Sequence, residues 1–132
     1  MNAQEFEKEV RELRQRQRRF FHCRKDDPDR PKALELMRSQ EKLLLPVIEA
    51  VMALRPIGKK VGNDREEFFL LVADMMRKQK EWVRQGGGSW QMNPARETER
   101  MVDKWLSRWD EERKAEERQR KEELARRQPK LF

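Results

Sequence analysis

The sequence predicts an all-α protein in which two tandem helical hairpins pack into a four-helix bundle, with the last helix extended and highly charged. Three observations carry this prediction. Apolar residues recur at helical spacing, prolines and glycines divide the chain into four segments, and the first and third segments match each other. Since 43% of the 132 residues are charged and 36% are hydrophobic, we expect one thin-cored domain rather than a thickly layered enzyme.

The first two helices are predicted from apolar stripes and from the breakers between them. From Phe6, apolar residues recur at steps of four, three and seven, which places them on one face of a helix over 3–25. Aspartates and prolines at 26–31 then supply turn and capping chemistry. A second helix reaches about residue 54, and Pro46 inside it predicts a kink or a break, because proline removes a backbone donor. Its predicted inward residues are Leu34, Met37, Leu44, Ile48 and Val51.

Capping residues and glycines mark the last two helices. Asn63 or Asp64 is expected to cap the third helix, glycines at 86–88 form a turn, and Asn93 with Pro94 starts the fourth. The inward residues expected on the third helix are Phe68, Val72, Met75, Met76, Trp82 and Val83. Those expected on the fourth are Met101, Val102, Trp105, Leu106 and Trp109.

The apolar stripe stops at Trp109, although the chain remains helix-prone beyond it. There, acidic residues precede basic ones by four, an order worth roughly 0.2–0.5 kcal/mol per pair in a solvated helix. The pairs are Asp110 with Lys114, Glu116 with Arg120, Glu117 with Lys121, Glu122 with Arg126, and Glu123 with Arg127. We therefore divide the chain into a bundle at 1–109 and a charged helical extension with a free tail at 110–132.

A shift of 62 residues aligns the two hairpins, with repeat one at about 6–45 and repeat two at about 68–107. Gln17 then corresponds to Gln79, in mid-stripe of each helix, where a buried amide needs partners. The two amides are candidates to bond each other across a pseudo-twofold axis. Alternatively, each bonds a backbone carbonyl or lies at the rim of the core.

The run from Val10 to Phe21 places basic residues around a glutamine, ahead of two aromatic residues. This run and its counterpart from Met75 to Trp82 resemble a small helical hairpin found in uncharacterised proteins of bacterial prophages and other mobile elements. The resemblance covers both hairpins and excludes the charged tail. It implies a genetic setting and no activity.

The first helix is strongly basic, with seven basic residues between Arg11 and Lys25 against one acidic residue, Glu12. Two flanks of this helix could straddle a phosphate backbone, and such binding would be driven by counterion release. The alternative is an ordinary solvated face, balanced by acidic residues elsewhere in the bundle. The candidate residues for binding DNA or an acidic partner are Arg11, Arg14, Arg16, Arg18, Arg19 and Lys25.

The C-terminal tail offers a second candidate site, formed by Gln128, Leu131 and Phe132. Glutamine followed three residues later by Leu-Phe resembles the pentapeptide by which many bacterial replication and repair proteins dock on the sliding clamp. Leu131 and Phe132 could fill an apolar pocket while Gln128 hydrogen-bonds at its edge. Pro129 and Lys130 depart from the usual pattern.

No catalytic residue, metal site or cofactor is predicted. His22 and Cys23 are the only histidine and cysteine, and a zinc site needs further ligands. No apolar run approaches the roughly 20 residues of a membrane span. A thiol without a disulfide partner is common in intracellular proteins, so we expect a soluble cytoplasmic protein.

Three functions fit these observations. The first is a non-enzymatic accessory or adaptor protein of a prophage or mobile element, which binds DNA or an acidic partner through the basic first helix. The second is a structural or assembly protein that acts only through protein contacts and dimerises through aromatics such as Trp90 and Trp109. The third is a clamp-binding modulator of host replication.

Overall fold

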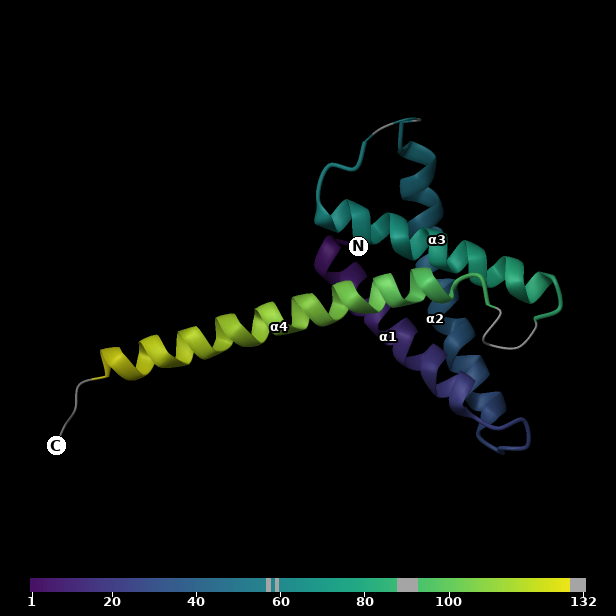
Figure 1. Cartoon of the computed structure of the whole chain (residues 1–132), viewed down its shortest axis with the longest axis horizontal. Helices are drawn as coiled ribbons and strands as arrows, with labels where there is room; N and C mark the ends of the chain where they lie inside the picture. Colours follow the sequence, from purple (N-terminus) through teal and green to yellow (C-terminus); the bar gives the residue numbers. More distant parts are fainter. Residues whose placement is uncertain (57, 59, 88–92, 129–132) are drawn as a thin grey trace.

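The computed structural model consists of four helices and describes residues 1–56, 58, 60–87 and 93–128. In chain order the helices are α1 (Ala3–His22), α2 (Arg30–Leu54), α3 (Asp64–Arg84) and α4 (Arg96–Arg127). Helix α1 packs against α2 and α3 packs against α4, so the chain forms two consecutive hairpins, which cross each other (Figure 1). The predicted fold class is therefore confirmed.

Local sequence explains where most of these helices begin and end. The Asn2 side chain accepts a hydrogen bond from the Glu5 amide at 2.8 Å while Glu5 reaches back to the Asn2 amide, which together make a capping box. Asn63 caps α3 through the Glu66 amide at 2.9 Å. At the other end of α3, Gly86 has a φ of 96° and lets the chain turn back on the last helical carbonyls.

Helix α2 continues through Pro46, so the break that we considered there does not occur. Pro46 is exposed, and so is Lys42, whose carbonyl would accept the missing hydrogen bond. Water can therefore satisfy that carbonyl, which limits the cost of proline at this position.

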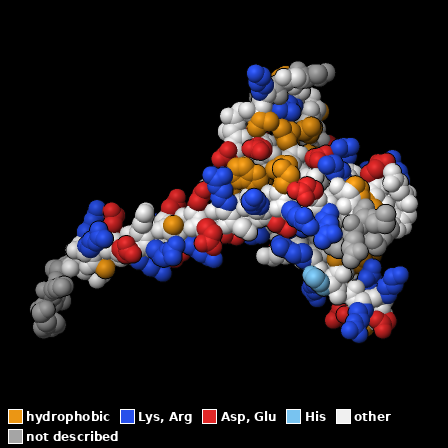
Figure 2. Space-filling model, in the orientation of Figure 1, with side chains coloured by type: hydrophobic (Ala, Val, Ile, Leu, Met, Phe, Trp, Pro, Cys, Tyr) orange, Lys and Arg blue, Asp and Glu red, His pale blue; other side chains and the backbone are white. Residues whose placement is uncertain are grey.

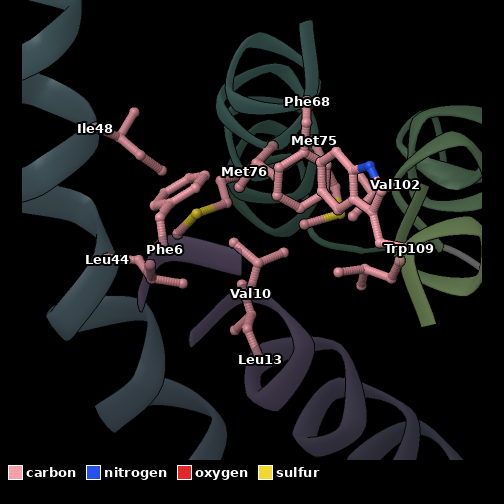
Figure 3. Packing of buried hydrophobic residues seen from close by; sticks show 12 residues of the cluster. Phe6, Val10, Leu13, Leu44, Ile48, Phe68, Met75, Met76, Val102 and Trp109 are labelled. Atoms are coloured by element: carbon pink, nitrogen blue, oxygen red, sulfur yellow. The ribbon is translucent and has the colours of Figure 1, made fainter. Parts of the chain in front are cut away.

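One hydrophobic core joins all four helices (Figure 3). Phe68 of α3 lies at its centre, with its ring 6.0 Å from that of Phe6 and 4.8 Å from that of Trp109. Five pairs of core residues that are 62 positions apart are buried in both hairpins, as the internal repeat predicts. The buried pairs are Phe6 and Phe68, Val10 and Val72, Leu13 and Met75, Ala33 and Ala95, and Leu44 and Leu106.

Several details differ from the sequence prediction. Helix α1 ends at His22 rather than near Lys25. Val51, Val83 and Met101 were expected in the core, but 45%, 65% and 42% of their surfaces are exposed. Val51 lies beyond Ile48, the last buried residue of α2. Trp109, which the assembly function uses for dimer contacts, is only 7% exposed, because it packs on Phe68.

Helix α4 runs well beyond the bundle (Figure 1). Its 32 residues correspond to about 48 Å at 1.5 Å per residue. After Trp109 no residue up to Gln128 is buried, and basic and acidic side chains alternate along this part (Figure 2). Of the five ion pairs predicted there, Glu117 with Lys121 is formed at 3.5 Å. Asp110 instead pairs with Arg11 of α1 at 2.8 Å, and Lys114 with Glu111 at 3.7 Å.

Candidate functional site

Arg14, predicted to contact phosphate, is instead part of the protein interior. Its side chain is 4% exposed and donates to both carboxylate oxygens of Asp103, at 2.8 and 3.0 Å. A second carboxylate, that of Glu99, accepts from the same guanidinium at 3.0 Å. Because a phosphate could reach Arg14 only by breaking these buried bonds, we remove Arg14 from the candidate binding residues.

Two other arginines of the basic helix are also engaged within the protein. Arg11 pairs with Glu7 at 2.9 Å and with Asp110 at 2.8 Å. Arg16 pairs with Glu12 at 3.0 Å and donates to the Leu36 carbonyl at 2.8 Å. The basic helix therefore uses about half of its predicted binding set to hold α2 and α4 in place.

The remaining predicted residues, Arg18, Arg19 and Lys25, are exposed. Arg18 lies 3.9 Å from Asp103 and also donates to the Arg14 carbonyl. Lys25 directly precedes a turn that carries three aspartates, at 26, 27 and 29. The outer face of α1 therefore presents a smaller and less uniform positive charge than the sequence count suggests.

Gln17 and Gln79 bond each other, as one of the two sequence interpretations predicts. The Gln17 amide donates to Gln79 Oε1 at 2.9 Å, and the Gln79 amide donates to Gln17 Oε1 at 3.2 Å. Gln17 is 1% exposed, so this reciprocal pair is largely shielded from water. The two amides therefore join the equivalent helices α1 and α3.

The residues on the two sides of this glutamine pair differ in polarity. On the α1–α4 side, Arg14 bonds Glu99 and Asp103; we call these three residues the polar seam. The 62-residue shift relates Arg14 to Met76, Glu99 to Met37 and Asp103 to Glu41. On the α2–α3 side, two methionines therefore occupy the positions that correspond to the buried ion pair of Arg14 and Glu99.

Among the described residues, nothing closes the α2–α3 side. A groove of about 610 Å³ lies there, and its lining includes Met37, Met76, Gln17 and Gln79. Aromatic and aliphatic side chains line most of it, and they come from α1, α2 and α3. These residues are Phe20, Phe21, Leu34, Met37, Leu45, Met76, Trp82 and Val83.

Cations surround this groove. Arg38 and Lys42 of α2 and Lys80 of α3 are exposed, and none of them forms an ion pair with another residue that the structure describes. Arg30 also lines the groove, with its guanidinium 4.4 Å from the centre of the Phe20 ring. The acidic residue among the lining side chains is Glu41. The site therefore combines an apolar wall with a net positive rim.

Glu41 lies in this groove without the arginine that its counterpart Asp103 has. Burial raises the pKa of Glu41, and the charge of Arg38 opposes this shift without cancelling it. The charged groups that line the groove together with Glu41 are Arg30, Arg38 and Lys42 of α2 and Lys80 of α3, while α1 contributes uncharged Gln17, Phe20 and Phe21. A carboxyl whose folded-state pKa is raised destabilises the fold above that pKa, and this penalty disappears as the pH falls.

We therefore expect Glu41→Gln to raise the free energy of unfolding by about 1 kcal/mol at neutral pH, a usual size for a point substitution. The gain should vanish well below the ordinary glutamate pKa of 4.5, where wild-type Glu41 is protonated in both states. Denaturant unfolding at the two pH values measures this. Glu49→Gln, at an exposed position of the same helix, is the control. A less stable Glu41→Gln protein at neutral pH would show that the carboxylate has a stabilising partner.

A second charged cluster fixes the extension of α4 to the bundle. Glu7 of α1 is 4% exposed at its side chain and accepts from Arg11 at 2.9 Å, from Arg65 of α3 at 2.6 Å and from Arg113 of α4. Burial alone would raise the pKa of Glu7, but the three guanidinium groups together lower it. The guanidinium of Arg65 also lies 3.9 Å from the Trp109 ring.

The remaining predicted sites are less informative. Gln128 is exposed and follows the last residue of α4, while Leu131, Phe132 and Trp90 lie outside the described residues. Within the described part, His22 is exposed, Cys23 is a half-buried free thiol, and no group of His, Cys, Asp or Glu side chains could hold a metal ion. None of the described helices is long and apolar enough to cross a membrane.

Sequence reasoning did not identify the groove. The clue was the 62-residue shift, which places Met76 at the position of Arg14 and Met37 at that of Glu99. Such a paired change from charged to apolar residues indicates that the α2–α3 side differs from the polar seam.

Comparisons with protein-family models, with curated proteins and with solved structures each return no match to this chain.

Proposed function

We propose that this protein is a non-enzymatic adaptor that binds an acidic partner protein at the groove between α2 and α3. The observation that carries the proposal is the open apolar groove of about 610 Å³ with a positive rim. An apolar cleft with a few polar groups at its edge is typical of binding sites. The large apolar side chains in its wall would gain free energy when a partner covers them.

The groove supports this function better than the basic face of α1 supports DNA binding. Arg11, Arg14 and Arg16 are engaged in internal contacts, so a duplex would meet mainly Arg18, Arg19 and Lys25. Duplex binding is driven by phosphate contacts and gains little from an apolar cleft. The genetic setting in a prophage or mobile element stays a prediction.

A displayed library of random peptides, selected on the wild-type protein, tests this function. We expect enriched peptides whose affinity falls at least about tenfold in Leu34→Gln/Val83→Gln, because both positions line the groove. Val83→Gln alone provides a milder variant, since 65% of Val83 is exposed and the change should leave the fold intact.

Met101→Gln/Leu124→Gln is the matched control, because both residues are exposed and neither lines the groove. Its affinity for the enriched peptides should equal that of the wild type. A selection without enrichment, or peptides that bind the groove variant as well as the wild type, would overturn the proposed function.

A further inference from the structure

The groove is the open counterpart of the polar seam, and this equivalence indicates what kind of ligand it takes. One pair of equivalent basic residues makes a related contact within each hairpin. Arg16 donates to the carbonyl of Leu36 at 2.8 Å, and its counterpart Lys78 donates to the hydroxyl of Thr98 at 3.2 Å, 62 residues from Leu36. The two hairpins thus share this contact, whereas the side chains between α1 and α4 differ from those between α2 and α3.

On the polar seam, the gap between α1 and α4 is filled by Arg14, whose buried guanidinium makes bonds on three sides. Methionine at the equivalent position 76 makes no such bonds and leaves the gap between α2 and α3 open. Methionine side chains are flexible and polarizable, so Met37 and Met76 can adapt to an apolar surface placed against them.

The shape of the groove suits a helix. From Leu34 to Leu45, α2 lines it over about 17 Å, or three helical turns. Helix α3 forms the opposite wall with Met76, Trp82 and Val83. A cleft between two helices with apolar walls accepts the apolar stripe of an amphipathic helix.

The positive charge of the rim indicates which charge the bound helix should carry. Arg38, Lys42 and Lys80 are exposed on the two sides of the groove, and none of them forms an ion pair with the described residues. A ligand helix whose apolar stripe enters the groove places its flanking residues beside these cations. Acidic residues at the flanks would complement them, whereas basic residues there would meet like charges.

We infer that the groove binds an acidic amphipathic helix of a partner protein, with the apolar stripe of that helix between Met37 and Met76 and its acidic flanks beside Arg38, Lys42 and Lys80. This inference rests on the proposed function and specifies its ligand. The complex should weaken as the ionic strength rises, because the rim charges are exposed and salt screens them.

Two synthetic peptides of about 18 residues, long enough to form a helix, provide the test. Both carry the same leucine stripe, with glutamate flanks in one and lysine flanks in the other. Fluorescence anisotropy should show the acidic peptide binding the full-length protein at least about tenfold more tightly than the basic one, a typical effect of charge complementarity.

Charge reversal of the rim by Arg38→Glu/Lys42→Glu should remove this preference. Arg100→Glu/Lys104→Glu provides the matched control, because these residues occupy the equivalent positions on α4 and do not line the groove. Lys80→Glu on α3 is a second variant that leaves α2 unchanged, and it should weaken the acidic peptide in the same direction.

Equal binding of the two peptides, or tighter binding of the basic one, would overturn the inference and the acidic character of the partner, while docking in the groove stands, provided that Leu34→Gln/Val83→Gln still weakens both. Binding that neither the groove variant nor the rim variants change would overturn both. Failure of the acidic peptide to bind at low salt would also overturn the inference.

Discussion

Arg14→Met should lower the free energy of unfolding by about 3–5 kcal/mol, because it leaves the buried carboxylate of Glu99 without its cation. Burial already raises the pKa of Glu99, nearby Asp103 raises it further, and Arg14 opposes both effects. Removing the guanidinium therefore removes the main group that favours the charged form of Glu99. Denaturant unfolding of the wild type and the variant measures this loss.

The double variant Arg14→Met/Glu99→Met should recover to within about 1 kcal/mol of the wild type, since apolar residues of similar volume often replace a buried ion pair without loss. It copies the pair of Met76 and Met37 that already exists on the other side of the bundle. Arg18→Met, at an exposed position one turn away, should change stability little. A double variant as unstable as Arg14→Met would contradict the equivalence of the two sides.

Glu7→Ala should lower the free energy of unfolding by about 3 kcal/mol, because Glu7 joins α1, α3 and α4 by accepting from three arginines. Asp110→Ala, which removes a carboxylate that is 44% exposed, should cost less than about 1 kcal/mol. Chemical denaturation of both variants measures the difference.

The pH dependence gives an independent check on Glu7. The pKa of Glu7 is lowered in the folded protein, so its contribution is present above the unfolded pKa and is lost as the pH falls through the folded value. The difference between the wild type and Glu7→Gln should therefore shrink in acid. A difference that stays constant with pH, or grows in acid, would contradict the role of the Glu7 carboxylate.

Local patterns in the sequence were sufficient to predict the helices and much of the core. The stripe that starts at Phe6 and the cap at Asn63 are short-range features, and the structure retains both. The internal repeat predicted more than the local patterns, because it related Gln17 to Gln79, which lie in different helices and bond each other. Periodicity and duplication therefore predicted the architecture.

The charged residues were harder to place, because their partners are far away in the sequence. Arg14 borders the apolar stripe of α1 and is interpreted as exposed, since arginine is rarely buried without a partner. Its partners Glu99 and Asp103 lie 85 and 89 residues further along the chain. Only the crossing of the two hairpins brings them together. The groove was missed for the same reason, since its walls come from three separate helices.

The central claim is that a partner docks between α2 and α3, and methyl NMR of the methionine side chains tests it most directly. Met37 and Met76 line the groove, whereas Met52 and Met101 are exposed elsewhere and serve as internal controls. During titration with the acidic amphipathic peptide, we expect the methyl signals of Met37 and Met76 to shift while those of Met52 and Met101 stay in place. Shifts at Met52 or Met101 without shifts at Met37 and Met76 would contradict docking in the groove.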